Sequence, residues 1–312
     1  MTLELRFRAM GCPIFVALDS ANPEAEAELE LVPIWFENWE QLLSRFRADS
    51  ELSRLNAARQ PMHVSPNFWR VLQAAQTAYQ QSSGLVNPMI LPALEAAGYD
   101  RSIEFVQQGE WSQTVSLEFE RVAAFEEVLL DEEQRTVTLP SDSRLDLGGV
   151  AKGWAAQEAM QRLAQLGSVL VDASGDIAIN GAPHATVGWR IGVADPFGEA
   201  EHCLVIEVAQ GGVATSGRDR RQWAQNGEPQ HHLIDPRTQA PSQTDVLSAT
   251  VIADDLLRAE MASKTALLLG SQEGMEWLEQ HEDLEGLLIL EDGSQLTSKH
   301  FKEFIVEQSC LI

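Results

Sequence analysis

The sequence has 312 residues, of which 44% are hydrophobic, and this is enough apolar material for one large core or two smaller ones. Its 47 acidic residues outnumber 22 basic ones, so the net charge is -25 at pH 7. Such a charge repels the phosphate backbone of nucleic acids and the surface of anionic membranes unless a local basic patch intervenes. We therefore expect no nucleic-acid partner and no membrane-surface role.

The N-terminal residues alternate between apolar and charged side chains, and no long uninterrupted apolar stretch follows anywhere. The sequence therefore predicts neither a signal peptide nor a membrane span, and we expect a cytoplasmic protein. The three cysteines, Cys12, Cys203 and Cys310, are widely spaced and odd in number. This predicts thiols rather than a disulfide framework or a zinc site.

In the first part of the chain, a hairpin and two helices are expected. Residues 3–7 alternate with strand period, and the apolar run at 14–18 follows a turn. Residues 22–46 are helical in composition, although Pro33 should kink or split that helix. A second helix is expected from residue 65 to about residue 84.

The second half opens with a helix over residues 150–166, closed by Gly167, and then becomes rich in strands. The strand candidates carry β-branched runs bounded by Gly, Pro or Asp: SVLVDASGDIAI, WRIGVADP, CLVIEVAQ, VLSATVIAD and LEGLLIL. Helices are expected at 254–269 and 274–280. The pattern predicts an α+β fold of mixed or antiparallel sheets with flanking helices. Since no linker composition marks a boundary, we expect one domain over residues 1–312, with room for two lobes.

The segment LDLGGVAKG combines Asp146, Gly148, Gly149 and Lys152 in one turn before a helix. Exposed N–H groups of a glycine turn at a helix N-terminus favour a phosphate, whereas an aspartate favours a cation. Both hold if the ligand is a metal-bound pyrophosphate. The alternative is an ordinary helix start with a capping acid and a solvated lysine. The spacing matches neither a P-loop nor a dinucleotide fingerprint.

The segment HHLIDPRT at residues 231–238 contains adjacent histidines. On an extended chain they point to opposite faces, so only one can serve a given site, and a single general base is a better interpretation than a zinc pair. A surface turn with solvated histidines is the alternative.

Two further segments carry polar side chains with a simpler structural explanation. In VATSGRDRRQW, Thr215 and Ser216 precede arginines that suit phosphate or ribose, but the arginines can equally neutralise nearby acids. On the helix AEMASKTALLLG, Glu260 and Lys264 lie four residues apart on one face, as in an ordinary ion pair.

Taken together and in order, nine segments resemble the successive blocks of the ApbE-type FAD:protein FMN transferases. These segments are AMGCPIFVAL, LSRFRADSELSRLN, GLVNPMILPALEAAGYD, LDLGGVAKGWAAQEA, VDASGDIAING, GWRIGVADP, VATSGRDRR, HHLIDPRT and ATVIADDLLRAEMASKTALLLG. The resemblance covers about residues 6 to 290. Each block is weak alone, but nine in sequence are a specific signal.

The resemblance implies an α+β fold related to the T-fold, with FAD bound in a cleft between lobes. Members of the family cleave the FAD pyrophosphate and attach FMN by a phosphoester bond to a Thr or Ser of a target protein, releasing AMP. Magnesium (Mg²⁺) sits on the pyrophosphate. The implied partners are FAD and an acceptor protein that the sequence does not identify.

Carried over residue by residue, the resemblance assigns FAD contacts to eight positions: Met10, Phe46, Leu85, Val86, Asn87, Asp146, Lys152 and Ile234. It assigns magnesium to the carbonyl of Gly149 and to Glu260. His232 matches the histidine proposed to deprotonate the acceptor hydroxyl, and an imidazole that titrates near neutrality suits that role.

The chain departs from the family pattern most clearly in the last helix. There the family has an Asp and, four residues later, a Thr that bind magnesium; this chain has Glu260 and Lys264. A protonated lysine cannot ligate magnesium and repels it. Either the metal shifts towards Glu260 and one of Asp254, Asp255 or Thr265, or the Lys264 ammonium replaces the metal. The second interpretation implies an FAD-binding protein with weak or no transferase activity.

Smaller departures lie elsewhere. Asn87 and Met89 stand where the family has Asp and Thr, Phe46 stands where it usually has tyrosine, and Ser174 replaces the first glycine of a GGD segment.

Overall fold

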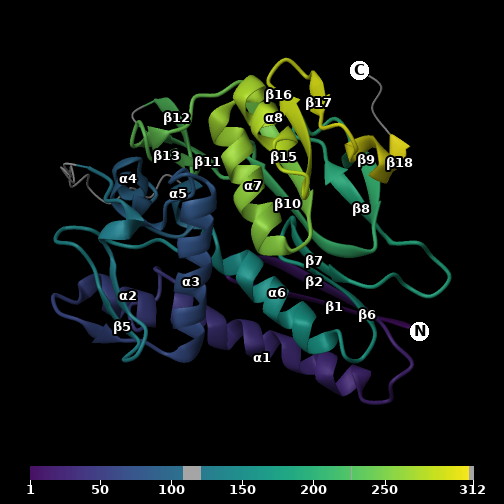
Figure 1. Cartoon of the computed structure of the whole chain (residues 1–312), viewed down its shortest axis with the longest axis horizontal. Helices are drawn as coiled ribbons and strands as arrows, with labels where there is room; N and C mark the ends of the chain where they lie inside the picture. Colours follow the sequence, from purple (N-terminus) through teal and green to yellow (C-terminus); the bar gives the residue numbers. More distant parts are fainter. Residues whose placement is uncertain (108–120, 226, 309–312) are drawn as a thin grey trace. The chain divides into compact units, whose positions relative to one another are not determined.

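The structure is a computed structural model that describes residues 1–107, 121–225 and 227–308. The chain divides into two compact units, each assembled from separated segments (Figure 1). Unit 1 comprises Met1–Glu37, Lys152–Asp219 and Thr244–Ile312, and unit 2 comprises Asn38–Ala151 and Arg220–Gln243. The assignment of a single functional domain stays a prediction.

An eight-stranded sheet forms the centre of unit 1. Its strands, in spatial order, are β1 (Thr2–Ala9), β2 (Cys12–Asp19), β6 (Ser168–Asp172), β7 (Asp176–Asn180), β10 (Gln210–Gly217), β15 (Val246–Ala253), β16 (Leu284–Leu290) and β17 (Gln295–Thr297). All the described strand pairs are antiparallel. The expected opening hairpin is therefore confirmed. Its turn residues Met10 and Gly11 have φ values of 52° and 71°, as a two-residue hairpin turn requires.

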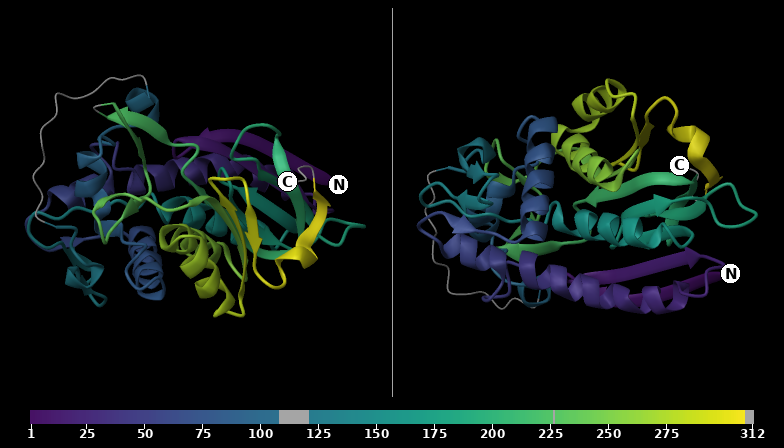
Figure 2. Two further views of the ribbon diagram at one scale, coloured as in Figure 1. Left: turned by 90° about the horizontal axis from the view of Figure 1, so that it is seen from above. Right: turned by 60° about the horizontal axis from the view of Figure 1, so that its bottom comes forward.

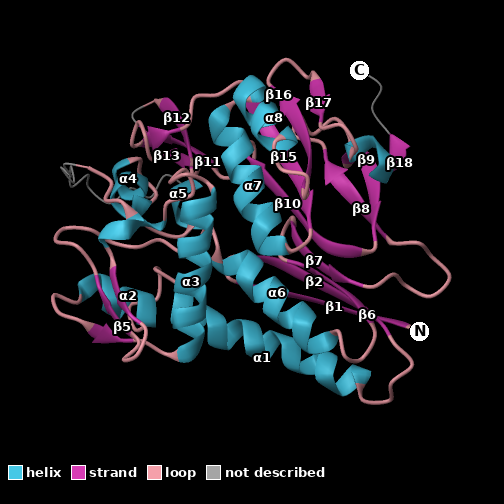
Figure 3. Ribbon diagram, in the orientation of Figure 1, coloured by secondary structure: helices cyan, strands magenta, loops and turns pink. Residues whose placement is uncertain are grey.

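Helices lie along one face of this sheet (Figures 1 and 3): α1 (Ala25–Leu43), α6 (Ala151–Leu163), α7 (Leu256–Leu269) and α8 (Ser271–Glu279). In unit 1, α1 buries Val32 and Phe36. The rings of Phe36 and of Phe7 from β1 pack edge to face, with their centres 5.4 Å apart. α1 is a single helix through Pro33, so the expected split does not occur. α7 packs against β10 and β15.

A smaller antiparallel sheet completes unit 1. It contains β8 (Trp189–Ala194), β9 (His202–Val208) and β18 (Ile305–Gln308), which follows the 3-10 turn η3 (Phe301–Phe304). Figure 2 shows the strands of unit 1 from two further directions. Apolar residues from both sheets form one core, which includes Ile179, Ile206 and Phe301 at 0% exposure. The predicted α+β class with antiparallel sheets is thus confirmed.

Unit 2 is built from short elements. Its helical segments are α2 (Glu51–Ala57), α3 (Pro66–Gln81), η1 (Pro88–Ile90), α4 (Leu91–Ala96), α5 (Ile103–Gln107) and η2 (Phe125–Glu127). A three-stranded sheet joins β3 (Met62–His63), β5 (Thr136–Thr138) and β4 (Leu129–Asp131). Two small pairs, β11 (Gln222–Gln225) with β12 (Glu228–His231) and β13 (Ile234–Asp235) with β14 (Ala240–Pro241), come from the second segment.

The second segment of unit 2 is anchored in the core of the first. Trp223 and Ile234 pack with Leu94, Ala97 and Tyr99 in one apolar cluster. The indole Nε1 of Trp223 donates a hydrogen bond of 2.8 Å to the carbonyl of Ala97, which satisfies the polar end of a buried aromatic residue. Residues 220–243 are thus a structural part of this unit.

Cys12 and Cys203 are buried thiols, as predicted, and Cys310 lies outside the described residues. Among the residues that the structure describes, no helix is both long enough and apolar enough to cross a lipid bilayer.

Candidate functional site

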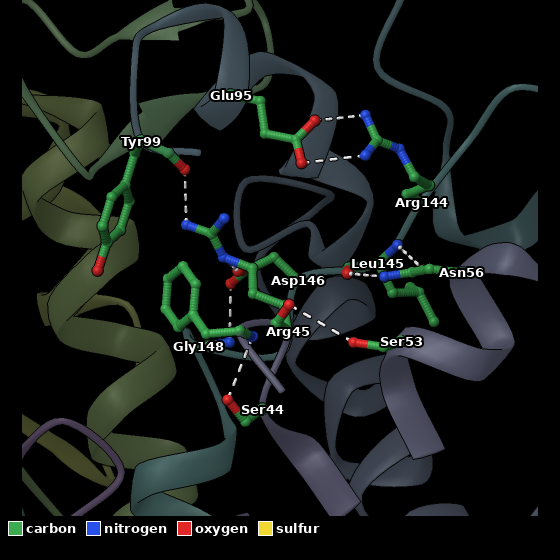
Figure 4. Close-up of polar contacts among 11 residues, drawn as sticks. Ser44, Arg45, Ser53, Asn56, Glu95, Tyr99, Arg144, Leu145, Asp146 and Gly148 are labelled. Atoms are coloured by element: carbon green, nitrogen blue, oxygen red, sulfur yellow. Dashed lines mark hydrogen bonds and ion pairs between the residues drawn. The ribbon is translucent and has the colours of Figure 1, made fainter. Parts of the chain in front are cut away.

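In unit 2, the glycine turn is held by Asp146 (Figure 4). One oxygen of its carboxylate accepts a 2.8 Å hydrogen bond from the N–H of Gly148, and the other lies 2.7 Å from Nε of Arg45. The backbone N–H of Asp146 donates to the carbonyl of Pro88 at 2.8 Å. Asp146 therefore fixes the turn before α6 from three directions. Both interpretations of this segment, ligand site and helix start, are compatible with that geometry.

Arg45 links this carboxylate to a pair of aromatic rings. Its guanidinium lies 4.2 Å from the centre of the Phe46 ring and 4.6 Å from that of Tyr99, and it donates a 2.8 Å hydrogen bond to the Tyr99 carbonyl. The Arg45 side chain is only 7% exposed, whereas Phe46 is 45% exposed. An exposed ring of this size beside a buried cation is able to stack on a planar ligand. Arg45 was not singled out from the sequence, although it lies in the quoted LSRF block.

The segment of Leu85, Val86 and Asn87 leads into η1. Asn87 is 7% exposed; its Oδ1 accepts from the N–H of Met89 at 3.0 Å, and its Nδ2 donates to the Ala123 carbonyl at 2.9 Å. An amide can make both contacts at once, whereas a carboxylate could not donate to a carbonyl. The replacement of the family aspartate by Asn87 is therefore matched by a partner within the chain.

The two adjacent histidines have different surroundings. Nε2 of His231 lies 3.0 Å from the Ser242 carbonyl, and its Nδ1 accepts a 3.3 Å hydrogen bond from the N–H of Leu233. Both ring nitrogens of His231 thus have backbone partners. His232 is half-buried with its Nδ1 shielded from solvent. That only one of the pair serves a site stays a prediction.

The turn after His232 is braced by Asp235. Its side chain is 5% exposed, accepts from the Arg237 backbone N–H at 2.8 Å and forms a bidentate pair with the Arg237 guanidinium. Ile234, one of the predicted FAD positions, is 3% exposed and belongs to the apolar cluster. Its side chain therefore has a packing role, and any ligand contact must come from its backbone.

In unit 1, Lys152 at the start of α6 forms an ion pair with Asp176 of β7. The side chains are 16% and 6% exposed, respectively. This excludes the solvated lysine of the structural alternative. Asp176 directly follows the turn residues Ser174 and Gly175, whose φ values are 63° and 95°. The sequence did not single it out, because one aspartate after a turn carries no distinctive pattern.

On α7, Glu260 and Lys264 form the i,i+4 pair that helical spacing predicts, with Nζ 2.9 Å from Oε1. Glu260 is 1% exposed, and its Oε2 is buried without a hydrogen-bond partner among the described residues. Burial raises the pKa of Glu260 above its ordinary value, while the charge of Lys264 acts in the opposite direction. Asp176 and Lys152 also influence its charge state, so these four side chains form one electrostatic group.

The hydroxyls of the TSG segment have protein partners in unit 1. Thr215 pairs with Thr250 at 2.9 Å, and Ser216 pairs with Ser263 of α7 at 2.8 Å. Arg218 donates to the carbonyls of Thr244 and Val246 and pairs with Glu291. For Arg218, the structural explanation is therefore correct.

The residues of α7 do not fit a magnesium ion. One oxygen of Glu260 already accepts from an ammonium, and the other lies against Gly153, where a Cβ would approach it to 2.2 Å. Magnesium keeps an octahedral shell that includes several waters, and this enclosed carboxylate leaves little room for them. At an effective dielectric constant of about 20, the Lys264 ammonium would repel a single positive charge 4 Å away by about 4 kcal/mol, and a divalent cation by more.

Two of the three alternative ligands considered from the sequence, Thr265 and Asp255, are also engaged. Thr265 is 0% exposed and donates to the Met261 carbonyl at 2.9 Å, and Asp255 caps α7 by accepting from the Arg258 N–H at 2.9 Å. Within the described parts of the chain, no group of three His, Cys, Asp or Glu side chains is placed to hold a metal.

Some of the predicted site residues lie in each unit. Unit 2 places Phe46 and Asp146 around Arg45, and it holds Gly149 and His232 in braced turns. Unit 1 places Lys152 and Glu260 in one buried charge group, and Met10 in the first hairpin turn. The ligand roles of all these residues remain predictions.

Comparison with known proteins agrees with this architecture. The model of the ApbE family matches residues 10–288. An FAD:protein FMN transferase of Treponema pallidum is 29% identical over 294 residues, covering 89% of this chain and 81% of the relative. One from Klebsiella pneumoniae is 29% identical over 286 residues, covering 90% of this chain and 86% of the relative.

Solved structures show the same fold. The ApbE protein of Thermotoga maritima has a TM-score of 0.85 at 24% identity and covers 97% of this chain and 99% of its own. The flavin transferase ApbE of Vibrio cholerae has a TM-score of 0.79 at 22% identity, with the same coverage. An α+β chain with a braced glycine turn and an HxIDP turn, matched over most of its length, belongs to the ApbE family.

Proposed function

We propose that this chain is an FAD:protein FMN transferase. The observation that carries the proposal is the family match over residues 10–288, since relatives that align with about nine tenths of this chain are FAD:protein FMN transferases. The substrate is FAD, and the second substrate is a protein that presents a Thr or Ser hydroxyl. The identity of that protein and a cytoplasmic location stay predictions from the sequence.

In this proposal His232 is the general base. It accepts the proton of the acceptor hydroxyl, whose oxygen attacks the FMN phosphorus of FAD. The bond from that phosphorus to the bridging oxygen breaks, and AMP leaves with the electron pair. The neighbouring turn supports this assignment, because hydrogen bonds between Asp235 and Arg237 brace the chain three residues after His232.

The remaining predicted residues bind and orient FAD. The exposed ring of Phe46 offers a stacking surface for the flavin, and Arg45 behind it holds both the ring and Asp146. N–H groups of the turn at Gly148 and Gly149 suit a phosphate. Lys152 supplies positive charge for the pyrophosphate, as do cations in phosphoryl-transfer enzymes generally. Met10, Leu85, Val86, Asn87 and Ile234 are proposed to line the FAD site.

Magnesium supplies charge neutralisation on the pyrophosphate when it is bound in such enzymes. Gly149 and Glu260 are the positions that the resemblance gives to it. Since the Glu260 carboxylate is enclosed and paired with Lys264, we assign no step of the reaction to the metal.

The histidine pair allows a matched test of the base. We expect His232→Ala to lower the rate of FMN transfer by about 100-fold or more. The rate is measured as AMP released from FAD in the presence of a threonine peptide. His231→Ala is the control; it removes the imidazole contacts to Ser242 and Leu233 but not the base, so it should retain most of the rate and lose stability instead. Equal rates in wild type and His232→Ala would exclude the assigned role. FAD binding without AMP release in the wild type would favour a flavin-binding protein.

A further inference from the structure

The buried charge group of unit 1 contains two cations and two anions. Lys152 pairs with Asp176 and Lys264 pairs with Glu260, and all four side chains are at most 16% exposed. Buried charges persist only when they are compensated, and here each carboxylate has an ammonium partner. The group therefore holds as many acidic as basic side chains without any added ion.

Glu260 has no oxygen open to a hydrated metal. Its Oε1 accepts from Lys264 at 2.9 Å, and its buried Oε2 faces the backbone of α6 at Gly153. The Lys264 ammonium thus occupies the side of the carboxylate on which a divalent cation would have to bind.

Lys264 retains capacity for a ligand. An ammonium has three donors, and the structure describes one hydrogen bond from this one, to Glu260. Part of the side chain, 16%, is exposed. A phosphate oxygen that approaches this exposed side would receive a charge-assisted hydrogen bond from a cation already held in place.

We propose that Lys264 is a built-in replacement for the divalent cation, so that this chain binds the diphosphate of FAD without magnesium. The inference rests on the proposed use of FAD as substrate. The sequence alternative was an FAD-binding protein with weak or no transferase activity. This proposal differs because a chain that no longer needs the metal can still transfer FMN.

The first test measures FAD affinity by quenching of flavin fluorescence, with EDTA and with Mg²⁺. For the wild type, the two Kd values should agree within about twofold. Lys264→Thr restores the side chain typical of the family; its Kd in EDTA should rise by about tenfold, as expected for one lost charge-assisted contact, and recover with Mg²⁺. Lys264→Met, which has neither charge nor a ligand oxygen, should bind weakly in both solutions. A wild type that binds FAD only with Mg²⁺ overturns the inference.

A second test needs no FAD, and so separates this inference from the proposed function. Binding of Mn²⁺ alone, followed by electron paramagnetic resonance, should show no stoichiometric site in the wild type and a new site in Lys264→Thr. A stoichiometric Mn²⁺ site in the wild type that is unchanged in Lys264→Met would contradict the replacement. If FAD fails to bind under every condition, the proposed function is lost, while the Mn²⁺ titration still decides the role of Lys264.

Discussion

The two oxygens of the Asp146 carboxylate have different partners, and together they set the conformation of the glycine turn. Arg45 holds one oxygen at 2.7 Å, and the Gly148 N–H binds the other at 2.8 Å. With side chains 7% and 12% exposed, this is a buried ion pair, so removing one member leaves the other charge uncompensated.

We expect Arg45→Ala to lower the free energy of unfolding by about 3 kcal/mol, measured by urea denaturation. The control is Arg101→Ala in the same unit. Arg101 pairs with Asp100, and both side chains are about a third exposed, so its removal should cost less than about 1 kcal/mol. Similar losses for both variants would mean that the Arg45 contact contributes no more than a surface pair.

The importance of Asp146, Lys152 and His232 could be predicted from motif spacing, but their partners could not. Arg45 and Asp176 are far from these residues in sequence, and a local pattern does not specify which distant charges meet on folding. The same limit applies to Asn87, whose hydrogen bond to Ala123 depends on a loop 36 residues away.

At the scale of elements, α6 and α7 approach each other closely at Gly153. A Cβ at this position would lie 2.2 Å from Oε2 of Glu260 and 3.6 Å from Cγ of Leu256. Only glycine allows this approach, and the buried charge group depends on it.

Gly153→Ala should therefore destabilise the protein by about 1–3 kcal/mol, although alanine is the better helix former. In a Glu260→Ala background the clash disappears, and the same substitution should become neutral or stabilising by up to about 1 kcal/mol. Thermal unfolding of the four proteins of this double-mutant cycle measures the coupling. Additive effects would show that Gly153 and Glu260 do not meet.

Helix α8 is capped by a residue outside it. Its N-cap, Gly270, has no side chain, and Asp245 accepts instead from the Ser271 backbone N–H at 2.9 Å and from the Ser271 hydroxyl. Burial raises the pKa of Asp245, but these hydrogen bonds lower it more, so that it lies below its ordinary value.

Because this pKa is lowered in the folded state, its contribution to stability is present above the unfolded value of 3.8 and is lost as the pH falls through the folded value. We expect Asp245→Ala to cost about 0.5–1 kcal/mol at pH 7, the lower part of the range for caps, since the site is exposed and solvent screens it. Asp245→Asn keeps an acceptor but does not titrate. Urea denaturation at pH 7 and pH 3 should show the gap between wild type and Asp245→Asn closing at the lower pH; a constant gap would exclude this linkage.

Long periodic elements were predictable from sequence, whereas short ones were not. The first hairpin, α3 with its Ser65 cap, α7 and β16 lie where periodicity and capping place them. Of the kink or split predicted at Pro33, the split does not occur, because tertiary packing of α1 overrides the local cost of proline. The two- and three-residue strands of unit 2 carry too few residues to show a period.

At the scale of the whole molecule, the two units are interleaved rather than joined by a linker. The chain passes from one to the other after residues 37, 151, 219 and 243. Such a division leaves no composition break, which explains why a single compact domain was expected. The residues proposed to bind FAD come from segments of both units.

The net charge of -25 sets the background against which an anionic substrate must bind. Within about a Debye length of the surface this charge repels an anion such as FAD, so we propose that recognition depends on cations held within the chain, notably Arg45, Lys152 and Lys264. All three are less than a fifth exposed, and each is paired with an acid. Their fixed positions suit a diphosphate better than mobile surface lysines would.

The most direct test of the account is the intact mass of an acceptor peptide after incubation with FAD and this chain. A peptide with a single threonine should gain the mass of FMN less one water, and one AMP should be released for each peptide modified. The same peptide with valine at that position should be unchanged. The absence of any mass gain on the threonine peptide, with FAD bound and in both EDTA and Mg²⁺, would contradict the account.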